Sequence, residues 1–95
     1  MSDTRHVMVF AYDVQNDKIR RKVAALLEDR LVRVQRSVFE ARMTRAEAQS
    51  LAQLITPLLE DGDSLRVYCL NQDSLAASQA IGGAPFPERQ DFWLL

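Results

Sequence analysis

The stretch VMVFAYD, Val7 to Asp13, sets six apolar residues in a row before a single carboxylate. Valine, phenylalanine and tyrosine favour strands, and a continuous apolar run of this length is typical of a central strand covered on both faces. We therefore predict that this segment is the central strand of the fold. Asp13 then lies where the buried strand ends, and we expect its carboxylate to be partly desolvated there.

A basic amphipathic helix is predicted directly after this strand. Asn16 is a suitable N-cap, and the helix dipole favours Asp17 in the first turn. One apolar stripe follows the helical period and consists of Ile19, Val23, Leu26 and Leu27. The cations of this segment lie outside the stripe and are Lys18, Arg20, Arg21 and Lys22. The predicted helix is therefore apolar on its inner side and basic on its outer side.

The segment LVRVQRSVFE, Leu31 to Glu40, alternates as a strand does. One predicted face carries Val32, Val34 and Val38. The other face carries Arg33, Gln35, Ser37 and Phe39. An aromatic residue on an otherwise polar face indicates a contact with something other than solvent. A hairpin partner for this strand is expected near Ala41–Met43.

The second half of the chain repeats the order of helix and strand. TRAE, Thr44 to Glu47, is a capping box that begins a second amphipathic helix. Pro57 should loosen this helix before Gly62. SLRVYCL, Ser64 to Leu70, alternates as a further strand. Its inward positions include Cys69, which we expect to be a small core residue rather than a reactive thiol.

This order of elements predicts an α+β fold, the ferredoxin-like β-α-β-β-α-β sandwich with two helices on one face of an antiparallel sheet. We expect one domain over residues 1–95, with a core of about residues 5–70 and a tail over 71–95. Residues 74–82 could form a short helix or a short strand. DFWLL, Asp91 to Leu95, predicts an additional C-terminal strand. Its apolar side chains must be covered, and the sheet of a partner subunit in a homodimer is a good candidate.

Composition and charge narrow the classes of function. A hydrophobic share of 47% and a charged share of 26% are ordinary for a globular protein. No apolar run approaches the about 18 residues of a membrane span, and the N-terminus lacks the pattern of a signal peptide, so we expect a cytoplasmic protein without membrane contact. Residues 1–45 carry ten Lys and Arg against six Asp and Glu, whereas residues 46–95 carry two against seven. This asymmetry indicates either a basic binding surface or the solvated faces of ordinary helices.

Asp13 is the candidate for chemistry. The chain has no glycine-rich phosphate loop, CxxC pair or HExxH motif, and its single histidine, His6, begins the predicted first strand at the end opposite Asp13. The carboxylate of Asp13 could bind Mg²⁺ for phosphodiester chemistry. Alternatively, it could cap the following loop or pair with Arg20 or Arg33. Mg²⁺ needs further oxygen ligands, and a homodimer with Asp13 near its two-fold axis would supply a second carboxylate.

Four segments in order resemble the CRISPR-associated Cas-two family, small proteins that take part in acquiring new CRISPR spacers. They are YDV at Tyr12–Val14, the basic helix with Arg20, RVQRSVFE at Arg33–Glu40 and DSLRVYCL at Asp63–Leu70. The resemblance runs from about Val7 to Leu70, and AIGG with the apolar C-terminus fits the tail of the family. It is carried by order, spacing and length together, because none of the motifs is decisive alone.

The resemblance implies a homodimer whose C-terminal strand crosses to the partner's sheet, with a CRISPR integrase as a further partner. It implies a Mg²⁺-dependent endonuclease acting on single-stranded RNA or duplex DNA, in which Asp13 binds the metal between the subunits. The residues it assigns to catalysis are Asp13, Arg20, Arg33 and Phe39. The residues then expected to bind nucleic acid are Lys18, Arg20, Arg21, Lys22, Arg33 and Arg36.

Alternatives to catalysis remain open at the level of sequence. The family is also described as a non-catalytic scaffold that joins two integrase dimers around a DNA fragment, and an RNA-cleaving toxin could use the same fold. Two departures from the family pattern concern the first helix. The turn from Glu28 to Leu31 lacks the usual glycine. Lys22 stands where many members have a second arginine, and lysine lacks the fork that grips phosphate with two hydrogen bonds.

Overall fold

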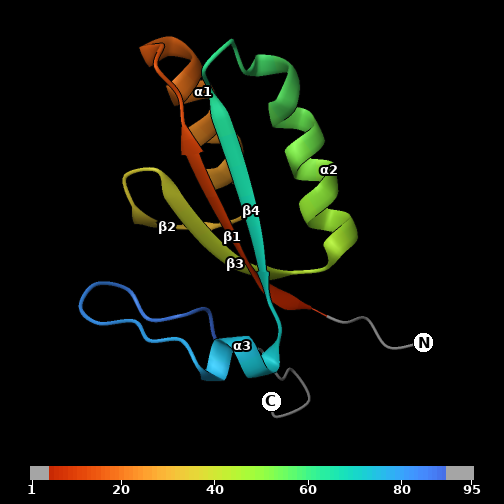
Figure 1. Ribbon diagram of the computed structural model, residues 1–95, viewed down its shortest axis with the longest axis vertical. Helices are drawn as coiled ribbons and strands as arrows, with labels where there is room; N and C mark the ends of the chain where they lie inside the picture. The colour runs from red at the N-terminus through yellow and green to blue at the C-terminus, as the bar shows by residue number, and fades with distance from the viewer. Residues whose placement is uncertain (1–4, 90–95) are drawn as a thin grey trace.

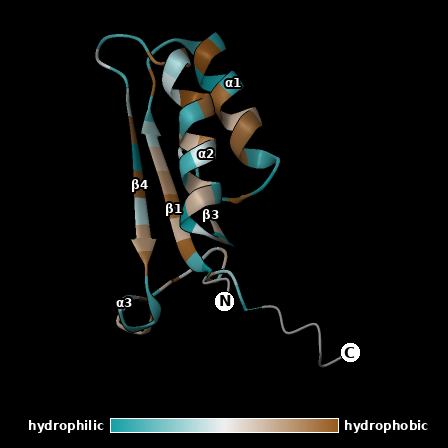
Figure 2. Cartoon of the chain, turned by 90° about the vertical axis from the view of Figure 1, so that its right-hand side faces the viewer, coloured by the Kyte–Doolittle hydropathy of each residue, from teal (hydrophilic) through white to brown (hydrophobic). Residues whose placement is uncertain are grey.

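A computed structural model describes residues 5–89, which form a four-stranded antiparallel sheet with two helices packed on one face (Figures 1 and 2). The elements in chain order are β1 (His6–Asp13), α1 (Asp17–Glu28), β2 (Val32–Gln35), β3 (Val38–Met43), α2 (Arg45–Ile55), the 3-10 turn η1 (Thr56–Leu58), β4 (Ser64–Leu70) and α3 (Gln72–Ala76). The strands lie in the order β2-β3-β1-β4, and β1 pairs antiparallel with both of its neighbours. This arrangement confirms the predicted ferredoxin-like α+β fold.

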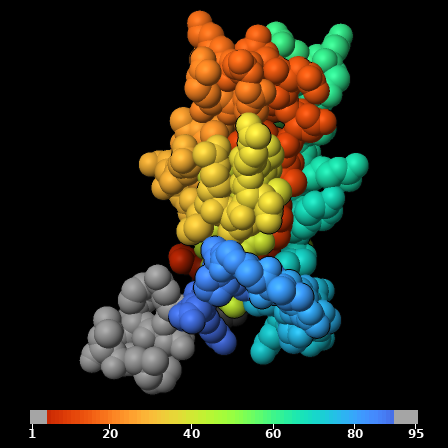
Figure 3. Space-filling model, turned by 90° about the vertical axis from the view of Figure 1, so that its left-hand side faces the viewer, coloured from red at the N-terminus to blue at the C-terminus, as the bar shows by residue number. Residues whose placement is uncertain are grey.

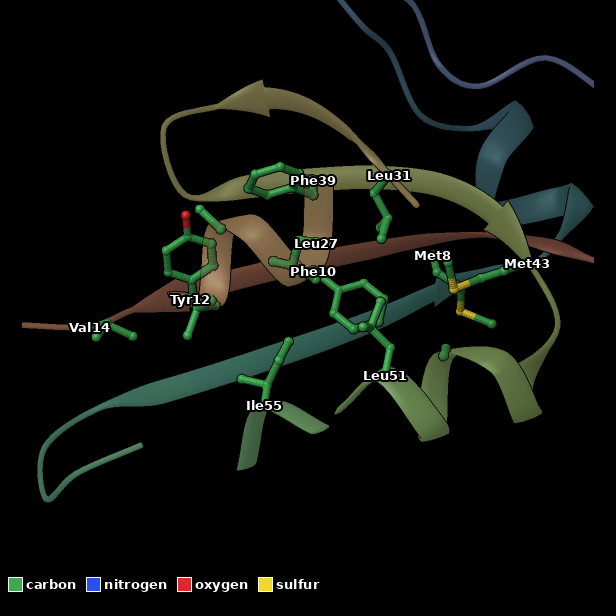
Figure 4. Close-up of a cluster of buried hydrophobic side chains, with 13 residues drawn as sticks. Met8, Phe10, Tyr12, Val14, Leu27, Leu31, Phe39, Met43, Leu51 and Ile55 are labelled. Carbon is green, nitrogen blue, oxygen red and sulfur yellow. The ribbon is translucent and has the colours of Figure 1, made fainter. Parts of the chain in front are cut away.

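The core lies between the two helices and one face of β1. Met8, Phe10 and Tyr12 occupy alternate positions of the strand on this side, and all three are buried. Phe10 lies opposite Phe39 of β3 and Val67 of β4 in the register of the sheet. Figure 4 draws the cluster that these side chains form with residues of both helices, which include Val23, Leu27, Leu51 and Ile55.

The opposite, helix-free face of the sheet is less buried than predicted. Beyond the buried Val7, the β1 residues Val9 and Ala11 are only half-buried. On the flanking strands, Val32 is 59% exposed and Tyr68 is 48% exposed. The prediction that β1 is covered on both faces is therefore wrong for most of the strand, because α1 and α2 pack on the same side of the sheet.

The strand predicted over Leu31–Glu40 is in fact the hairpin β2–β3, which reverses at Arg36–Ser37. This turn contains neither glycine nor asparagine, so no local turn signal marks it. Contacts from β1 hold it instead. The backbone N–H of Tyr12 donates to the Ser37 carbonyl oxygen at 3.1 Å, and the Tyr12 hydroxyl donates to the Arg36 carbonyl oxygen at 3.4 Å.

The hairpin places Phe39 in the core rather than on a polar surface. Phe39 is fully buried and lies opposite both Phe10 of β1 and Arg33 of β2. Its ring stacks on that of Tyr12, with the ring centroids 6.2 Å apart. Val32, which belongs to the other predicted face, is exposed on the helix-free side of β2. Arg33 and Phe39 share a face as predicted, and this face meets the helices, whereas Gln35 pairs with Val38 after a register shift and leaves the predicted face.

The predicted helix caps are confirmed. The Asn16 side chain accepts a hydrogen bond from the backbone N–H of Ile19 at 3.0 Å. Thr44 and Glu47 form the reciprocal capping box, with bonds of 3.1 and 2.9 Å. α2 then passes into η1, which contains Pro57, as the expected loosening before the next loop.

β4 has its predicted bounds, but the burial predicted for Cys69 is wrong. Leu65 packs against the core, whereas Val67 is 39% exposed and Cys69 is exposed. All three lie on the helix-bearing side, since they pair in register with Tyr12, Phe10 and Met8. β4 is an edge strand, and the helices cover an edge strand less completely than a central one.

The tail begins with α3, and residues 77–89 contain no further helix or strand. The open question over residues 74–82 is thus settled as the end of a short helix followed by a loop. The Arg42 Nε donates to the Pro87 carbonyl oxygen at 3.1 Å and ties this loop to β3. The strand predicted over Asp91–Leu95 lies outside the described residues. Within residues 5–89, no helix is long and apolar enough to cross a membrane.

The burial of Phe39 predicts a large effect on stability. Phe39→Ala should lower the free energy of unfolding by about 3–5 kcal/mol, because it removes a fully buried ring and leaves a cavity. Urea denaturation followed by circular dichroism measures this change. Leu54→Ala is the control, since Leu54 is 59% exposed and its truncation should stay within about 0.5 kcal/mol of wild type. Equal effects of the two substitutions would contradict the placement of Phe39.

The capping box predicts a pH-dependent contribution to stability. The hydrogen bond from the Thr44 backbone holds the pKa of the Glu47 carboxyl below its ordinary value of 4.5. The ionised form therefore stabilises the folded state above that value, and this contribution is lost as the pH falls through the lower folded pKa. Glu47→Gln keeps an acceptor but cannot titrate, so its free energy of unfolding should fall less on acidification than that of wild type. Parallel urea titrations at neutral and acidic pH test this, and an identical fall in both proteins would refute it.

Candidate functional site

A groove of about 780 Å³ lies between the end of β1, the first turns of α1 and the β2–β3 hairpin. Figure 3 views this side of the molecule, with the hairpin (yellow) against α1 (orange). We call it the basic groove, and its lining residues are Tyr12, Asp13, Val14, Gln15, Arg20, Arg21, Ala24, Arg33, Val34, Gln35, Arg36 and Ser37. It thus brings the predicted metal ligand together with four of the six cations that were expected to bind nucleic acid.

Asp13 is exposed at the end of β1, opposite Ser64 of β4. The expected partial desolvation of its carboxylate is wrong. By the alternation of β1, Asp13 shares the helix-free face with Val9 and Ala11, where the helices do not cover it. Within residues 5–89, its carboxylate has no hydrogen-bond or ion-pair partner.

Neighbouring acids fill the structural roles that Asp13 could have had. Arg20 pairs with Asp17. Arg33 lies 3.9 Å from the carboxylate of Glu28. The loop after β1 is bound by Asp63, whose Oδ1 accepts from the Gln15 backbone N–H at 3.2 Å. Asp13 therefore forms no ion pair with Arg20 or Arg33, and Asp63 rather than Asp13 caps the loop.

The side chain of Arg20 braces the β1–α1 loop. Besides its ion pair with Asp17, one guanidinium nitrogen donates to the carbonyl oxygens of Val14 at 3.1 Å and Gln15 at 3.3 Å. The side chain remains 38% exposed. Arg20 thus borders the groove with part of its guanidinium committed to the loop, and this fixes both the loop and the charge.

Arg33 is presented to the groove by the aromatic core beneath it. Its guanidinium carbon lies 5.0 Å from the centroid of the Phe39 ring, a cation–π distance. Phe39 in turn stacks on Tyr12. Phe39 is fully buried and does not line the groove, so the structure gives it a supporting position under Arg33 rather than a surface contact.

The remaining predicted cations differ in whether they line the groove. Arg21 and Arg36 line the groove and are exposed, and neither guanidinium has a partner in the described part of the chain. Lys18 and Lys22 are exposed on α1 but do not line the basic groove. They extend the positive charge along the outer side of the helix.

Asp63 also contributes to this region, and the sequence patterns did not predict its role. It stands just before β4 and contacts the loop that follows Asp13. Its only sequence cue was its place inside DSLRVYCL, after the turn at Gly62. The contact joins positions 48 residues apart, so no local pattern could reveal it.

Two carboxyl groups outside the groove have shifted pKa values. Burial raises the pKa of Glu40, which lies on β3 opposite Val9 and Val32 on the helix-free face. The pKa of Glu47 is lowered by its role in the capping box.

The residues present fit a magnesium ion whose other ligands come from water, substrate phosphate or a second copy of the chain. Mg²⁺ keeps several waters and is bound through one or two carboxylates together with substrate phosphates. Asp13, which is exposed and has no hydrogen-bond or ion-pair partner within residues 5–89, can supply one such carboxylate. The described residues contain no cluster of three or more potential metal ligands. A second copy of the chain could supply a further carboxylate.

Comparisons with known proteins agree with this geometry. The family model of CRISPR associated protein Cas2, the Cas-two family named above, matches residues 6–77. The chain is 40% identical over 86 residues to CRISPR-associated endoribonuclease Cas2 2 of Synechocystis, covering 88% of this chain and 92% of that protein.

Two solved structures extend the likeness to three dimensions. One is a hypothetical protein from Thermus thermophilus, with a TM-score of 0.72 and 34% identity, over 90% of this chain and 100% of that one. The other is a chain of a partial Cas6-RT-Cas1–Cas2 complex, with a TM-score of 0.68 and 34% identity, over 86% of this chain and 96% of that one. Sequence and fold together place this chain in the CRISPR-associated Cas2 family.

Proposed function

We propose that this protein acts in CRISPR spacer acquisition as a homodimer that binds nucleic acid beside the CRISPR integrase, and that its basic groove cleaves phosphodiester bonds with Mg²⁺. The observation that carries the proposal is that Asp13, whose carboxylate has no partner within residues 5–89, lines one groove together with four arginines. A carboxylate without a structural partner, next to cations suited to phosphate, matches the needs of metal-assisted phosphodiester chemistry.

The arginines of the groove support binding to a phosphate backbone. Arg21 and Arg36 are exposed and have no partner among residues 5–89, so both can form paired hydrogen bonds to phosphate oxygens. Lys18 and Lys22 add point charges along α1. Such contacts position a nucleic acid without reading its bases, which suits duplex DNA of any sequence as well as single-stranded RNA.

In the cleavage proposal, Asp13 of each subunit holds the metal. Bound Mg²⁺ supplies activation of water and neutralisation of the charge that develops on phosphate. Arg33, held on the Phe39 ring, and Arg20, held by the loop, keep positive charge beside the scissile phosphate. Their fixed orientation is useful because donors placed before the reaction need not reorganise during it.

The homodimer and the integrase complete the proposal. The helix-free face leaves Val32 and Tyr68 exposed, and Asp13 lies on this side of the sheet. A two-fold contact there with its axis near the end of β1 would bring two copies of Asp13 together. The tail over residues 71–95 is proposed to extend from the core over residues 5–70 and to pack on the partner. The likeness to a chain in a Cas6-RT-Cas1–Cas2 complex supports an integrase as further partner.

A scaffold without cleavage is the second candidate function. The observation that favours it is the charge imbalance of the groove, whose described lining contains four arginines and one carboxylate. Such a surface suffices to hold duplex DNA for an integrase. The scaffold would need the arginines and would tolerate the loss of Asp13, and this difference separates the two candidates.

Asp13→Asn tests the metal role directly. It should reduce Mg²⁺-dependent cleavage of RNA and duplex DNA by more than about 100-fold, because loss of even an outer-shell partner costs 10- to 100-fold and the amide supplies no anionic ligand. Cleavage is followed on end-labelled substrates across a Mg²⁺ titration.

Asp61→Asn is the matched control for this experiment, since Asp61 is exposed and has no partner in the described part of the chain. Undiminished cleavage by Asp13→Asn would refute the metal mechanism. If spacer acquisition in cells also survives Asp13→Asn, the scaffold function is the one that the protein performs.

Substitution of Arg21 and Arg36 together by alanine tests the binding surface. We expect weaker binding to duplex DNA and a slope of log affinity against log salt that is smaller by about 2, because each of the two arginines that neutralises a phosphate adds about one unit to the slope. Fluorescence anisotropy at several salt concentrations measures both. Arg45→Ala, at the start of α2 and outside the groove, is the control and should leave the slope unchanged. A slope that is the same in all three proteins would rule out the groove as the phosphate-binding surface.

A further inference from the structure

We infer that Asp63 is a positioning residue for the candidate metal ligand Asp13, because its carboxylate fixes the loop that follows β1. The inference rests on the proposed function in one respect only, the assignment of Asp13 as metal ligand. The contacts of Asp63 themselves are features of the fold.

The carboxylate of Asp63 joins two loops that are far apart in the sequence. Its Oδ1 accepts a hydrogen bond from the Gln15 backbone N–H at 3.2 Å. Its Oδ2 accepts one from the Glu60 backbone N–H at 2.9 Å. The backbone N–H of Asp63 also donates to the Glu60 carbonyl oxygen at 2.9 Å. One side chain therefore ties the β1–α1 loop to the turn that leads into β4.

The sheet places this contact next to Asp13. Ser64, the residue after Asp63, is the register partner of Asp13 at the end of the β1–β4 pair. Gln15, which Asp63 holds, is two residues beyond Asp13. On its other side, the Gln15 carbonyl oxygen accepts from the guanidinium of Arg20 at 3.3 Å. The loop is thus held at Gln15 through both the backbone N–H and the backbone carbonyl oxygen.

This clamp matters because the Asp13 carboxylate forms no hydrogen bond or ion pair within residues 5–89. Its position follows from β1 on one side and from the held loop on the other. Removal of the contact from Asp63 would free the Gln15 peptide and widen the range of positions open to the Asp13 carboxylate. Metal ligands held by outer partners bind more tightly than mobile ones, and such partners are worth about 10- to 100-fold in affinity.

A carboxylate is required for the double contact. Both oxygens of an ionised aspartate accept hydrogen bonds, whereas asparagine offers one accepting oxygen and one donating nitrogen. Asp63→Asn therefore leaves one of the two backbone N–H groups without its partner. Gly62, with φ of +89°, allows the tight turn that brings Asp63 back to Glu60. Asp61 in the same turn makes no such contact among the described residues and provides a matched control.

The experiment compares full-length wild type, Asp63→Asn, Asp63→Ala and Asp61→Asn. Amide hydrogen exchange measured by NMR should be faster at Gln15 in both Asp63 variants and unchanged in Asp61→Asn. Titration with Mn²⁺ alone, followed by paramagnetic broadening of the Asp13 amide signal, should show an affinity lower by about 10- to 100-fold in the Asp63 variants. A merely structural role would lower thermal stability without changing the metal affinity of the folded protein.

The outcomes separate the inference from the proposed function. Folded Asp63→Asn with wild-type Mn²⁺ affinity, or with wild-type exchange at Gln15, would overturn the positioning role and leave Asp13 as a metal ligand. Absence of broadening at Asp13 in the wild type would reject the metal site itself, and with it the inference. Equal losses of affinity in Asp61→Asn and Asp63→Asn would trace the effect to net charge and overturn the clamp.

Discussion

The pairing of β1 with strands on both of its edges is the constraint on which the rest of this structure depends. On its helix-bearing side, Phe10 lies in register with Phe39 and Val67, so the core continues across three strands. The same pairing sets Asp13 opposite Ser64 at the end of the strand. Tyr12, one residue earlier, closes the β2–β3 turn through its backbone and its hydroxyl. The groove therefore exists because one strand organises the elements on both sides of it.

Around this strand end, the acidic residues divide their tasks. Asp17 pairs with Arg20, Glu28 lies near Arg33 and Asp63 binds the loop. Each of these acids fills a structural role that Asp13 could otherwise have had. An exposed carboxylate that the fold does not use, beside arginines that the fold holds in place, is an arrangement suited to a ligand from outside. Membership of the Cas2 family gives this arrangement its biological setting.

The elements that local patterns predicted correctly are those that local physics specifies. An unbroken apolar run indicated β1, a capping box marked the start of α2, and strict alternation predicted the bounds of β4. The β2–β3 hairpin was not predicted, because its turn at Arg36–Ser37 is held by Tyr12, a residue more than twenty positions away in the sequence. The exposure of Cys69 was not predicted for a related reason. Alternation predicts the face of the sheet on which a side chain lies, but not whether its strand is at the edge of the sheet.

The same division applies to the candidate site. The sequence by itself determined the end of a central strand at Asp13, a helix with basic residues on its outer side and the family resemblance, because each depends on residue types at short spacing. Only the tertiary structure decided that Phe39 lies beneath Arg33, that Asp13 is exposed and unpaired within the described residues, and that Asp63 holds the adjoining loop. These features depend on contacts between segments that are distant along the chain, and the packing of the sheet is what brings those segments together.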